Sequence, residues 1–346
     1  LALVAIAVAV RAAKASRRRH WKATSPLRRA RVLVTGGSRG LGYRLATAFL
    51  ERGTAVALLA RDEKELLCAR VCLQAAHPGA IVATFSADVT DADAVRSAVV
   101  AAAERLGGLD VFVHNAGIIE VGPFESTTDR DFAHALDTHF WAAIHGIRTA
   151  LPYLGASGRG RIVLISSLGG RVAVPHMAPY VASKFALTGL GETLGAELAA
   201  RGIALTNVYP GLLRTGSHRH ARFKSRHREE YAWFAGGTAI PFLSMRAGAA
   251  AERIVRACER RQRSVVLGWA ARLAVRAQAF FPNTYARCLD AVARRMPSFG
   301  GIGSDSKPGY ASRSRRMPRS ATWLAERAAE RNLEWEPRRV PASGGR

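Results

Sequence analysis

A glycine-rich turn between a short apolar strand and a helix is the feature that most constrains this fold. Arg31–Thr35 is an apolar, β-branched run that predicts a buried strand, and apolar residues recur at helical spacing over residues 45–50. Gly36 can form the tight turn, Gly40 lets a pyrophosphate approach the backbone, and Gly42 lets the helix pack closely on the strand. The pattern predicts a dinucleotide site in an α/β fold, although an ordinary glycine turn without a ligand would look similar. The whole turn reads Thr35, Gly36, Gly37, Ser38, Arg39, Gly40, Leu41, Gly42.

The second predicted strand, residues 55–59, ends without the acidic residue that usually binds the ribose of NAD. Instead, Arg61 follows it, and Arg39 lies inside the glycine turn. Two guanidinium groups can bind a 2′-phosphate through charge-assisted hydrogen bonds, so we expect NADP(H) as the cofactor. We expect Asp62 to cap the next helix, predicted over Glu63–Ala76.

Tyr180 and Lys184 are four residues apart, which places both side chains on one face of a helix. A neighbouring ammonium favours the phenolate, so we expect the pKa of Tyr180 to lie below its usual value of about 10. Such a tyrosine can exchange a proton with an oxygen atom. Taken alone, the spacing also fits a packed tyrosine beside a lysine whose stem covers apolar surface.

In chain order, these motifs resemble those of the short-chain dehydrogenase/reductase family, over residues 31–268. The alternation of predicted strands and helices fits the family's doubly wound parallel sheet, a Rossmann fold with helices on both faces. The resemblance also implies three further cofactor-binding segments, at the adenine, at the floor of the site and at the nicotinamide. These are Asp88 and Val89; Asn115, Ala116 and Gly117; and Pro210, Gly211 and Thr215.

The resemblance implies a reaction as well, in which NADPH delivers a hydride to a carbonyl carbon and Tyr180 gives a proton to the alkoxide. Lys184 would lower the pKa of Tyr180 and bind the nicotinamide ribose, so both residues also belong to the cofactor site. Ser167, 13 residues before Tyr180, has the family's spacing for the serine that polarises the carbonyl oxygen. Ser166 is the weaker candidate, because neighbouring strand residues point to opposite faces.

His139 departs from the family pattern, which has an asparagine here to help hold a water that relays protons to the lysine. The histidine can simply fill the space, because a buried histidine is more often a satisfied structural group than a catalytic one. It can instead belong to the relay, since imidazole titrates near neutral pH. We expect the chain to be active with histidine at this position.

The net charge of +25 is confined to the two flanks of the chain. Residues 1–31 hold nine Lys or Arg and no acids, residues 32–211 hold 15 basic and 16 acidic residues, and residues 212–346 hold 27 and 10. A neutral body with basic flanks favours a surface that meets anionic partners, such as an anionic membrane.

Residues 1–30 are predicted to be an apolar and basic N-terminal anchor or leader. Residues 1–10 are wholly apolar but too short to span a bilayer, which needs about 20 residues. The segment fits the end of a membrane helix, the end of a signal sequence, an interfacial anchor or a disordered leader. If this segment is attached to a membrane and its positive charges stay on the inner side, the catalytic domain is expected in the cytoplasm. The cysteines of the chain are expected to be reduced, which fits the same compartment.

Residues 269–346 are predicted to be a basic helical extension with a partly disordered tail. Residues 269–281 form an amphipathic pattern that fits either a membrane-interface helix or a lid packed over the substrate. Helices are also predicted over residues 285–296 and 320–332, with loop or disorder over residues 298–320. The family pairs through its two long helices, here residues 129–154 and 179–201, which implies a homodimer or homotetramer.

The substrate is expected to contact two irregular segments, residues 168–177 and 212–234. The apolar side chains expected at the substrate are Val172, Val174 and Met177 in the first segment and Leu212, Leu213, Phe223, Trp233 and Phe234 in the second, which is also rich in His, Arg and Lys. This favours a hydrophobic, lipid-like carbonyl compound or alcohol with an acidic group, unless the basic face is merely solvated. The chemistry needs no metal, and the cysteine spacing offers no zinc site.

Two other classes of function fit parts of the sequence. A catalytically weak or inactive regulator would keep the dinucleotide site, and a nucleic-acid-binding protein would use the flanking charge. The basic stretches contain no recognisable nucleic-acid module, so we expect no nucleic acid partner.

Overall fold

The strand before the glycine turn, β1, lies near the middle of a seven-stranded parallel sheet. In the computed structural model, which describes residues 25–239, 243–313 and 319–334, its side chains serve two cores. Val32 and Val34 pack on one face of the sheet and Leu33 on the other. A strand buried on both faces is apolar throughout, as its sequence is. In the order β11-β7-β6-β4-β1-β2-β3, the strands are Ser264–Leu267, Ala204–Pro210, Arg161–Ile165, Val111–His114, Arg31–Thr35, Ala55–Ala60 and Val82–Ser86.

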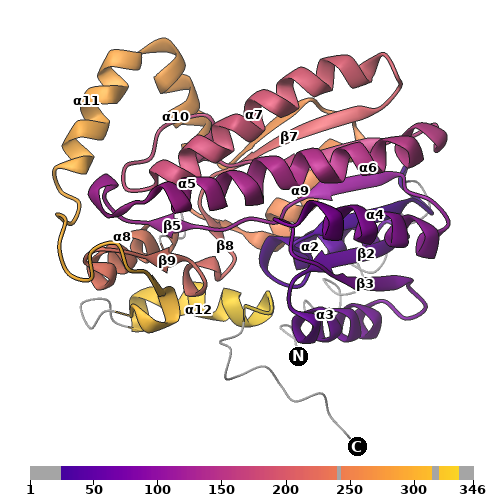
Figure 1. The fold of residues 1–346 in the computed structure, drawn as a ribbon, viewed down its shortest axis with the longest axis horizontal. Coiled ribbons are helices and arrows are strands. Elements are labelled where there is room, and N and C mark those ends of the chain that lie inside the picture. The colour runs from indigo at the N-terminus through magenta and orange to yellow at the C-terminus, as the bar shows by residue number, and fades with distance from the viewer. Residues whose placement is uncertain (1–24, 240–242, 314–318, 335–346) are drawn as a thin grey trace, which may run out of the picture.

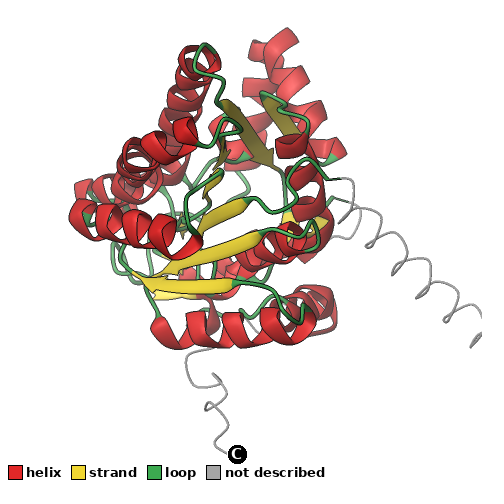
Figure 2. Cartoon of the chain, turned by 90° about the vertical axis from the view of Figure 1, so that its right-hand side faces the viewer, coloured by secondary structure: helices red, strands yellow, loops and turns green. Residues whose placement is uncertain are grey.

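Helices cover both faces of this sheet, which confirms the predicted doubly wound α/β fold (Figures 1 and 2). One face is covered by α2 (Gly40–Leu50), α3 (Glu63–Ala76) and α9 (Ala247–Glu259), and the other by α4 (Ala92–Leu106), α6 (Ala142–Ala156) and α7 (Ala178–Ala199).

The expected helix cap at the start of α3 is present. The side chain of Asp62 accepts a hydrogen bond from the N–H of Glu65 at 2.9 Å.

The strand order reverses between β1 and β4, which places a crevice at the carboxyl ends of these strands. After β1 the chain continues to β2 and β3 on one side, whereas β4, β6 and β7 lie on the other. Ligands of open parallel sheets bind at such a reversal. The glycine turn leaves the sheet at this point, because it directly follows β1.

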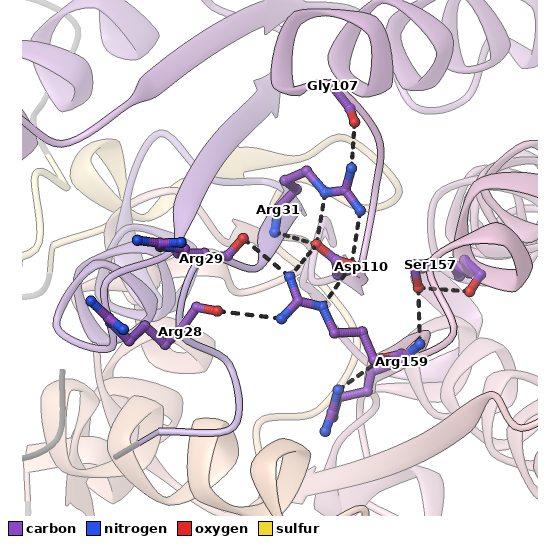
Figure 3. Close-up of polar contacts among 9 residues, drawn as sticks. Arg28, Arg29, Arg31, Gly107, Asp110, Ser157 and Arg159 are labelled. Atoms are coloured by element: carbon purple, nitrogen blue, oxygen red, sulfur yellow. Dashed lines mark hydrogen bonds and ion pairs between the residues drawn. The ribbon is translucent and has the colours of Figure 1, made fainter. Parts of the chain in front are cut away.

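At the opposite edge of the sheet, buried Asp110 ties the starts of three strands together (Figure 3). Its carboxylate accepts hydrogen bonds from the Nε of Arg31 at 2.8 Å and from the Nε of Arg159 at 3.0 Å. Arg159 also donates to the carbonyl oxygens of Arg28 and Arg29. Burial alone would raise the pKa of Asp110, but the hydrogen bonds from the two arginines lower it to about 2. The cluster therefore fixes the register of the sheet far from the glycine turn.

The predicted extension begins with a helical hairpin that projects from the body (Figure 1). It consists of α10 (Trp269–Phe280) and α11 (Pro282–Ala293), in which only Ala271 is buried. The apolar stripe of α10 therefore does not pack as a lid, since Leu273 and Phe280 are 60% and 74% exposed. Across the described residues, no helix has both the length and the apolar character that crossing a membrane requires.

The chain after the hairpin returns to the body of the protein. β12 (Lys307–Pro308) pairs antiparallel with β9 (Arg222–Phe223), which also pairs with β5 (Glu120–Val121). The loop predicted over residues 298–320 is therefore wrong around β12, because the edge of β9 offers partners for its backbone. Residues 314–318 lie outside the described residues, as do residues 1–24 and 335–346, which contain most of the predicted anchor and the tail.

The remaining elements complete the fold. α12 (Arg319–Arg331) confirms the predicted last helix and packs against α8 (His227–Ala239). A π-helical turn over Asp137–Trp141 joins α5 (Asp129–Leu136) to α6 without a break. The other elements are β8 (Leu213–Arg214) paired with β10 (Met245–Arg246), and 3-10 turns at Phe124–Ser126, Leu168–Gly170, Ser217–Arg219 and Gly309–Ala311.

Candidate active site

The glycines of the turn are required by its geometry. Gly36 and Gly40 have φ angles of +62° and +60°, where side chains are strained. At Gly42, a Cβ atom would lie 2.0 Å from the carbonyl oxygen of Gly36. The turn thus leads tightly into α2, whose first N–H groups have no intrahelical acceptor and suit an anion.

Thr35 and Asn115 hold this turn against the end of β4. The Oγ1 of Thr35 accepts hydrogen bonds from the backbone N–H groups of Asn115 and Ala116, both at 3.0 Å. The Nδ2 of Asn115 donates to the carbonyl oxygens of Thr35 at 3.1 Å and Gly36 at 3.0 Å. The side chain expected to form the floor of the site therefore also fixes the shape of the turn.

A cavity of about 710 Å³ opens at the crevice, next to the turn. Its size and its glycine cradle fit a dinucleotide together with a small substrate. Thr35 and Gly42 build the turn without lining the cavity. The other predicted site residues all line it: Gly36, Ser38, Arg39, Gly40, Leu41, Arg61, Asp88, Val89, Asn115, Ala116, Gly117, His139, Ser167, Tyr180, Lys184, Pro210, Gly211 and Thr215.

The two arginines expected at the 2′-phosphate already have carboxylate partners. Arg39 Nη1 lies 2.9 Å from Glu65 Oε1, and Arg61 Nη1 lies 3.6 Å from Asp88 Oδ2. The pair between Arg61 and Asp88 is long and open to solvent, so it holds the guanidinium weakly. Arg61 is therefore the more available of the two for a ligand.

Ser167, Tyr180 and Lys184 meet in the same cavity, from the end of β6 and the first turns of α7. Ser167 and Tyr180 form a side-chain hydrogen bond. The Nζ of Lys184 donates to the carbonyl oxygen of Ile165 at 3.0 Å and lies 5.8 Å from the centroid of the Tyr180 ring. Ser166 donates to the carbonyl oxygen of Lys184 at 3.1 Å, so its hydroxyl is engaged with α7.

The expected lowering of the Tyr180 pKa is wrong for the protein alone. Burial raises the pKa of Tyr180, and the hydrogen bond with Ser167 only partly opposes this effect. Burial also lowers the pKa of Lys184 to about 7, which reduces the charge that the lysine can place beside the phenol at neutral pH. Spacing alone gave no measure of this burial.

Both ring nitrogens of His139 have hydrogen-bond partners. Nε2 accepts from the backbone N–H of Ile118 at 3.1 Å, so a neutral ring must carry its proton on Nδ1. Nδ1 lies 2.7 Å from the Oγ of Ser183, which itself donates to the carbonyl oxygen of Tyr180 at 2.8 Å. Burial and the nearby Lys184 lower the pKa of His139 well below its usual value. These contacts favour a structural histidine over a titrating member of a relay.

A family model described as short chain dehydrogenase matches residues 30–225 of the chain. This segment contains the turn, Ser167, Tyr180 and Lys184 in the arrangement just described. The chain belongs to the short-chain dehydrogenase family. Members of the family bind a nicotinamide dinucleotide, either NAD or NADP, and the cavity of this short-chain dehydrogenase has the cradle for one.

Curated relatives and a solved structure agree with this assignment. The chain is 36% identical over 190 residues to 3-dehydrosphinganine reductase TSC10B of Arabidopsis thaliana, covering 54% of this chain and 56% of that protein. It is 38% identical over 184 residues to 11-beta-hydroxysteroid dehydrogenase 1A of the same plant, covering 53% and 52%. The chain thus spans about half the length of these relatives. A short-chain dehydrogenase from Streptomyces avermitilis superposes with a TM-score of 0.63 and 31% identity, covering 76% of this chain and 98% of that one.

One wall of the cavity is lined by apolar side chains. Much of the basic charge near this wall is paired with acidic side chains of the same chain. Leu212, Leu213, Phe234, Val174 and Met177 line the cavity, whereas the predicted Val172, Phe223 and Trp233 do not. The basic face expected on residues 212–234 is partly wrong, because three of its members are buried against acidic side chains. His218 and Arg219 pair with Glu326, and Lys224 pairs with Asp131.

Sequence reasoning missed Glu334, which also lines the cavity. It follows α12 and reaches the glycine turn only through the tertiary fold. The sequence carries no motif around Glu334 that indicates a place in the cofactor site.

Proposed function

We propose that this protein is an NADP(H)-dependent oxidoreductase that interconverts a carbonyl and an alcohol on a hydrophobic, lipid-like substrate. The observation that carries this proposal is the meeting of Ser167, Tyr180 and Lys184 in one cavity with the glycine turn. A weak or inactive regulator would need only the turn. Three catalytic groups converging beside an apolar wall favour an enzyme.

The residues divide the work in the direction of reduction. The raised pKa of Tyr180 keeps its phenol protonated at neutral pH, which is the form that donates a proton to an alkoxide. Ser167, hydrogen-bonded to Tyr180, polarises the carbonyl oxygen where negative charge develops. Lys184, fixed by the carbonyl of Ile165, orients the nicotinamide ribose and stabilises the phenolate that remains. A bound nicotinamide supplies the hydride.

The apolar wall supports a hydrophobic substrate. Leu212, Leu213 and Phe234 face the same cavity as Tyr180. The relatives named above are a 3-dehydrosphinganine reductase and a hydroxysteroid dehydrogenase, which act on lipid-like compounds. The acidic group expected on the substrate has less support, because Arg219 and Lys224 are already paired.

The preference for NADP(H) rests on Arg39 and Arg61, which both line the adenosine end of the cavity. The position after β2 is Arg61, where enzymes that use NAD place an acid for the ribose hydroxyls. Both guanidinium groups would exchange a carboxylate partner for the 2′-phosphate, and Arg61 does so more readily because its pair is exposed.

An anionic membrane surface is the proposed macromolecular partner of the cytoplasmic catalytic body. The hairpin of α10 and α11 exposes Trp269, Leu273, Phe280 and Phe281 together with several arginines. Aromatic and basic side chains on one exposed element suit a headgroup interface.

For self-association, exposed Trp141 at the start of α6 and Phe185 on α7 favour a homodimer or homotetramer through these helices.

The deciding experiment follows the absorbance of NADPH while the purified chain meets hydrophobic aldehydes, ketones and 3-oxo lipids. We expect oxidation by the wild type and a loss of turnover of about 100-fold or more in Tyr180→Phe, while the variant still binds NADPH. Binding without turnover on every substrate would support the regulator instead. Turnover that persists in Tyr180→Phe would refute the assigned mechanism.

A further inference from the structure

The residues that follow α12 cross the glycine turn. The carbonyl oxygen of Asn332 accepts a hydrogen bond from the N–H of Gly40 at 2.7 Å. The Nδ2 of Asn332 donates to the carbonyl oxygen of Thr215 at 2.8 Å, and Arg44 Nε donates to its Oδ1 at 2.6 Å. One asparagine thus bridges the start of α2 and the nicotinamide segment, the two sides of the cofactor cavity.

Glu334 extends this bridge over Gly40. Its Oε1 lies 2.5 Å from the position of a Cβ at Gly40, so the carboxylate rests where the absent side chain leaves room. The residue is 4% exposed and lines the cavity, and its Oε2 has no hydrogen bond. The nearest charged or titratable groups are Arg39 Nε at 3.6 Å and His220 Nε2 at 3.3 Å.

A buried carboxylate at this position competes with a phosphate. Both groups are anions that seek the free N–H groups at the start of a helix, and both pair with arginine. The space above Gly40 is also the space through which a pyrophosphate approaches the turn. Glu334 and the dinucleotide phosphates therefore require the same place.

We propose that Asn332–Glu334 forms a strap that occupies the phosphate-binding part of the cavity and is displaced when the dinucleotide binds. This inference rests on the proposed function, because it takes the dinucleotide to be the ligand. The strap makes Glu334 a determinant of cofactor affinity that acts against binding.

Displacing the strap breaks its hydrogen bonds to Gly40, Thr215 and Arg219 but leaves the attachment of α12 in place. Leu333 has a φ angle of +57°, which strains a residue with a side chain. The Oε2 of Glu334 is buried without a hydrogen bond, which is unfavourable, and burial raises the pKa of this carboxyl to about 7, against the opposing effect of Arg39. α12 itself stays tied to the body, because Arg219 pairs with Glu326. Opening therefore displaces residues 332–334 and leaves α12 in place.

The test measures cofactor binding by the full chain, from the fluorescence of bound NADPH and NADH. Glu334→Gln removes the charge at nearly constant shape, and we expect it to lower the Kd for NADPH by about fivefold. Glu330→Gln, an exposed glutamate on α12, is the matched control and should leave the Kd within about twofold of the wild type. An unchanged or weaker Kd in Glu334→Gln would overturn the strap.

Hydrogen exchange of residues 326–334 provides a second readout that separates a strap from a lid. A displaced strap exchanges faster when NADPH is added, whereas a lid that closes over the cofactor exchanges more slowly and would contradict the proposal. If neither the wild type nor any variant binds NADPH or NADH, the proposed function itself fails. Equal binding by all variants overturns the strap alone.

Discussion

The Nδ1 of His139 and the Oγ of Ser183 lie 2.7 Å apart, and this contact joins the π-helical turn before α6 to α7. Ser183 belongs to the turn of α7 between Tyr180 and Lys184, so the histidine supports this proposed catalytic pair from behind. Its other nitrogen holds the backbone of Ile118. The family's asparagine position is thus occupied by a group that is fully used in packing and hydrogen bonding.

Replacing His139 tests this structural role. In His139→Ala, the N–H of Ile118 and the hydroxyl of Ser183 each lose a hydrogen-bond partner. We therefore expect the free energy of unfolding to fall by about 1–3 kcal/mol. We expect kcat to fall by less than about tenfold, because the ring is not needed as a proton carrier. Urea unfolding and steady-state kinetics on the same samples check both.

A loss of kcat near that of Tyr180→Phe in a folded variant would instead place His139 in the relay. A rise of kcat by orders of magnitude in His139→Asn would show that the natural chain is a poor catalyst.

Replacing the two neighbouring serines, Ser166 and Ser167, is expected to have different effects on kcat. Ser167→Ala removes the group that polarises the carbonyl oxygen, and we expect kcat to fall by about 100-fold. Ser166→Ala should keep kcat within about threefold but lower stability by about 1 kcal/mol, since it removes a buried hydrogen bond to α7. Kinetics and thermal unfolding of both variants decide the assignment. Equal losses of kcat would mean that the hydroxyl of Ser166 also acts in the site.

Cofactor preference should depend more on Arg61 than on Arg39. Arg39 is held by Glu65, so its removal changes less of the charge available to a ligand. We expect Arg61→Ala to reduce the ratio of NADPH to NADH affinity by about tenfold, and the double variant to reduce it further. Lys64→Ala, at an exposed position on α3, is the control. An unchanged ratio in the double variant would show that the 2′-phosphate binds elsewhere.

Acid should weaken the Asp110 cluster over a defined range. The pKa of Asp110 is about 2 in the fold, against about 3.9 in the unfolded chain. Its lowered pKa stabilises the fold fully above the unfolded value, and this contribution is lost as the pH falls from about 4 to about 2. Asp110→Asn should therefore cost about 3 kcal/mol at pH 7, and its difference from the wild type should shrink in that acid range.

Urea unfolding at several pH values measures this difference, with exposed Asp290→Asn as the control. That control should stay within about 0.5 kcal/mol of the wild type. A difference for Asp110→Asn that does not vary with pH would show that the carboxylate charge is not what stabilises the cluster.

Local patterns predicted the sheet, the turn and the pairing of Tyr180 with Lys184, and the family resemblance added Ser167. Each depends on residues close in sequence: a strand before Gly36, a helix after it, and Lys184 one turn from Tyr180. The same patterns failed where distant segments meet. The pKa of Tyr180 depends on how deeply α7 is buried, and the pairing of Arg219 depends on Glu326 in a helix far along the chain. Glu334 reaches Gly40 only because β12 and α12 bring the chain back.

The pairing of β12 with β9 has a consequence for the order in which this protein matures on the ribosome. All seven strands of the main sheet precede residue 268, so the sheet can assemble while residues 307–334 are still being made. Until then, β9 lacks its antiparallel partner and the cofactor cavity lacks Glu334. A nascent chain at that stage would accept a dinucleotide without meeting Glu334, and the cofactor could bind before the strap exists.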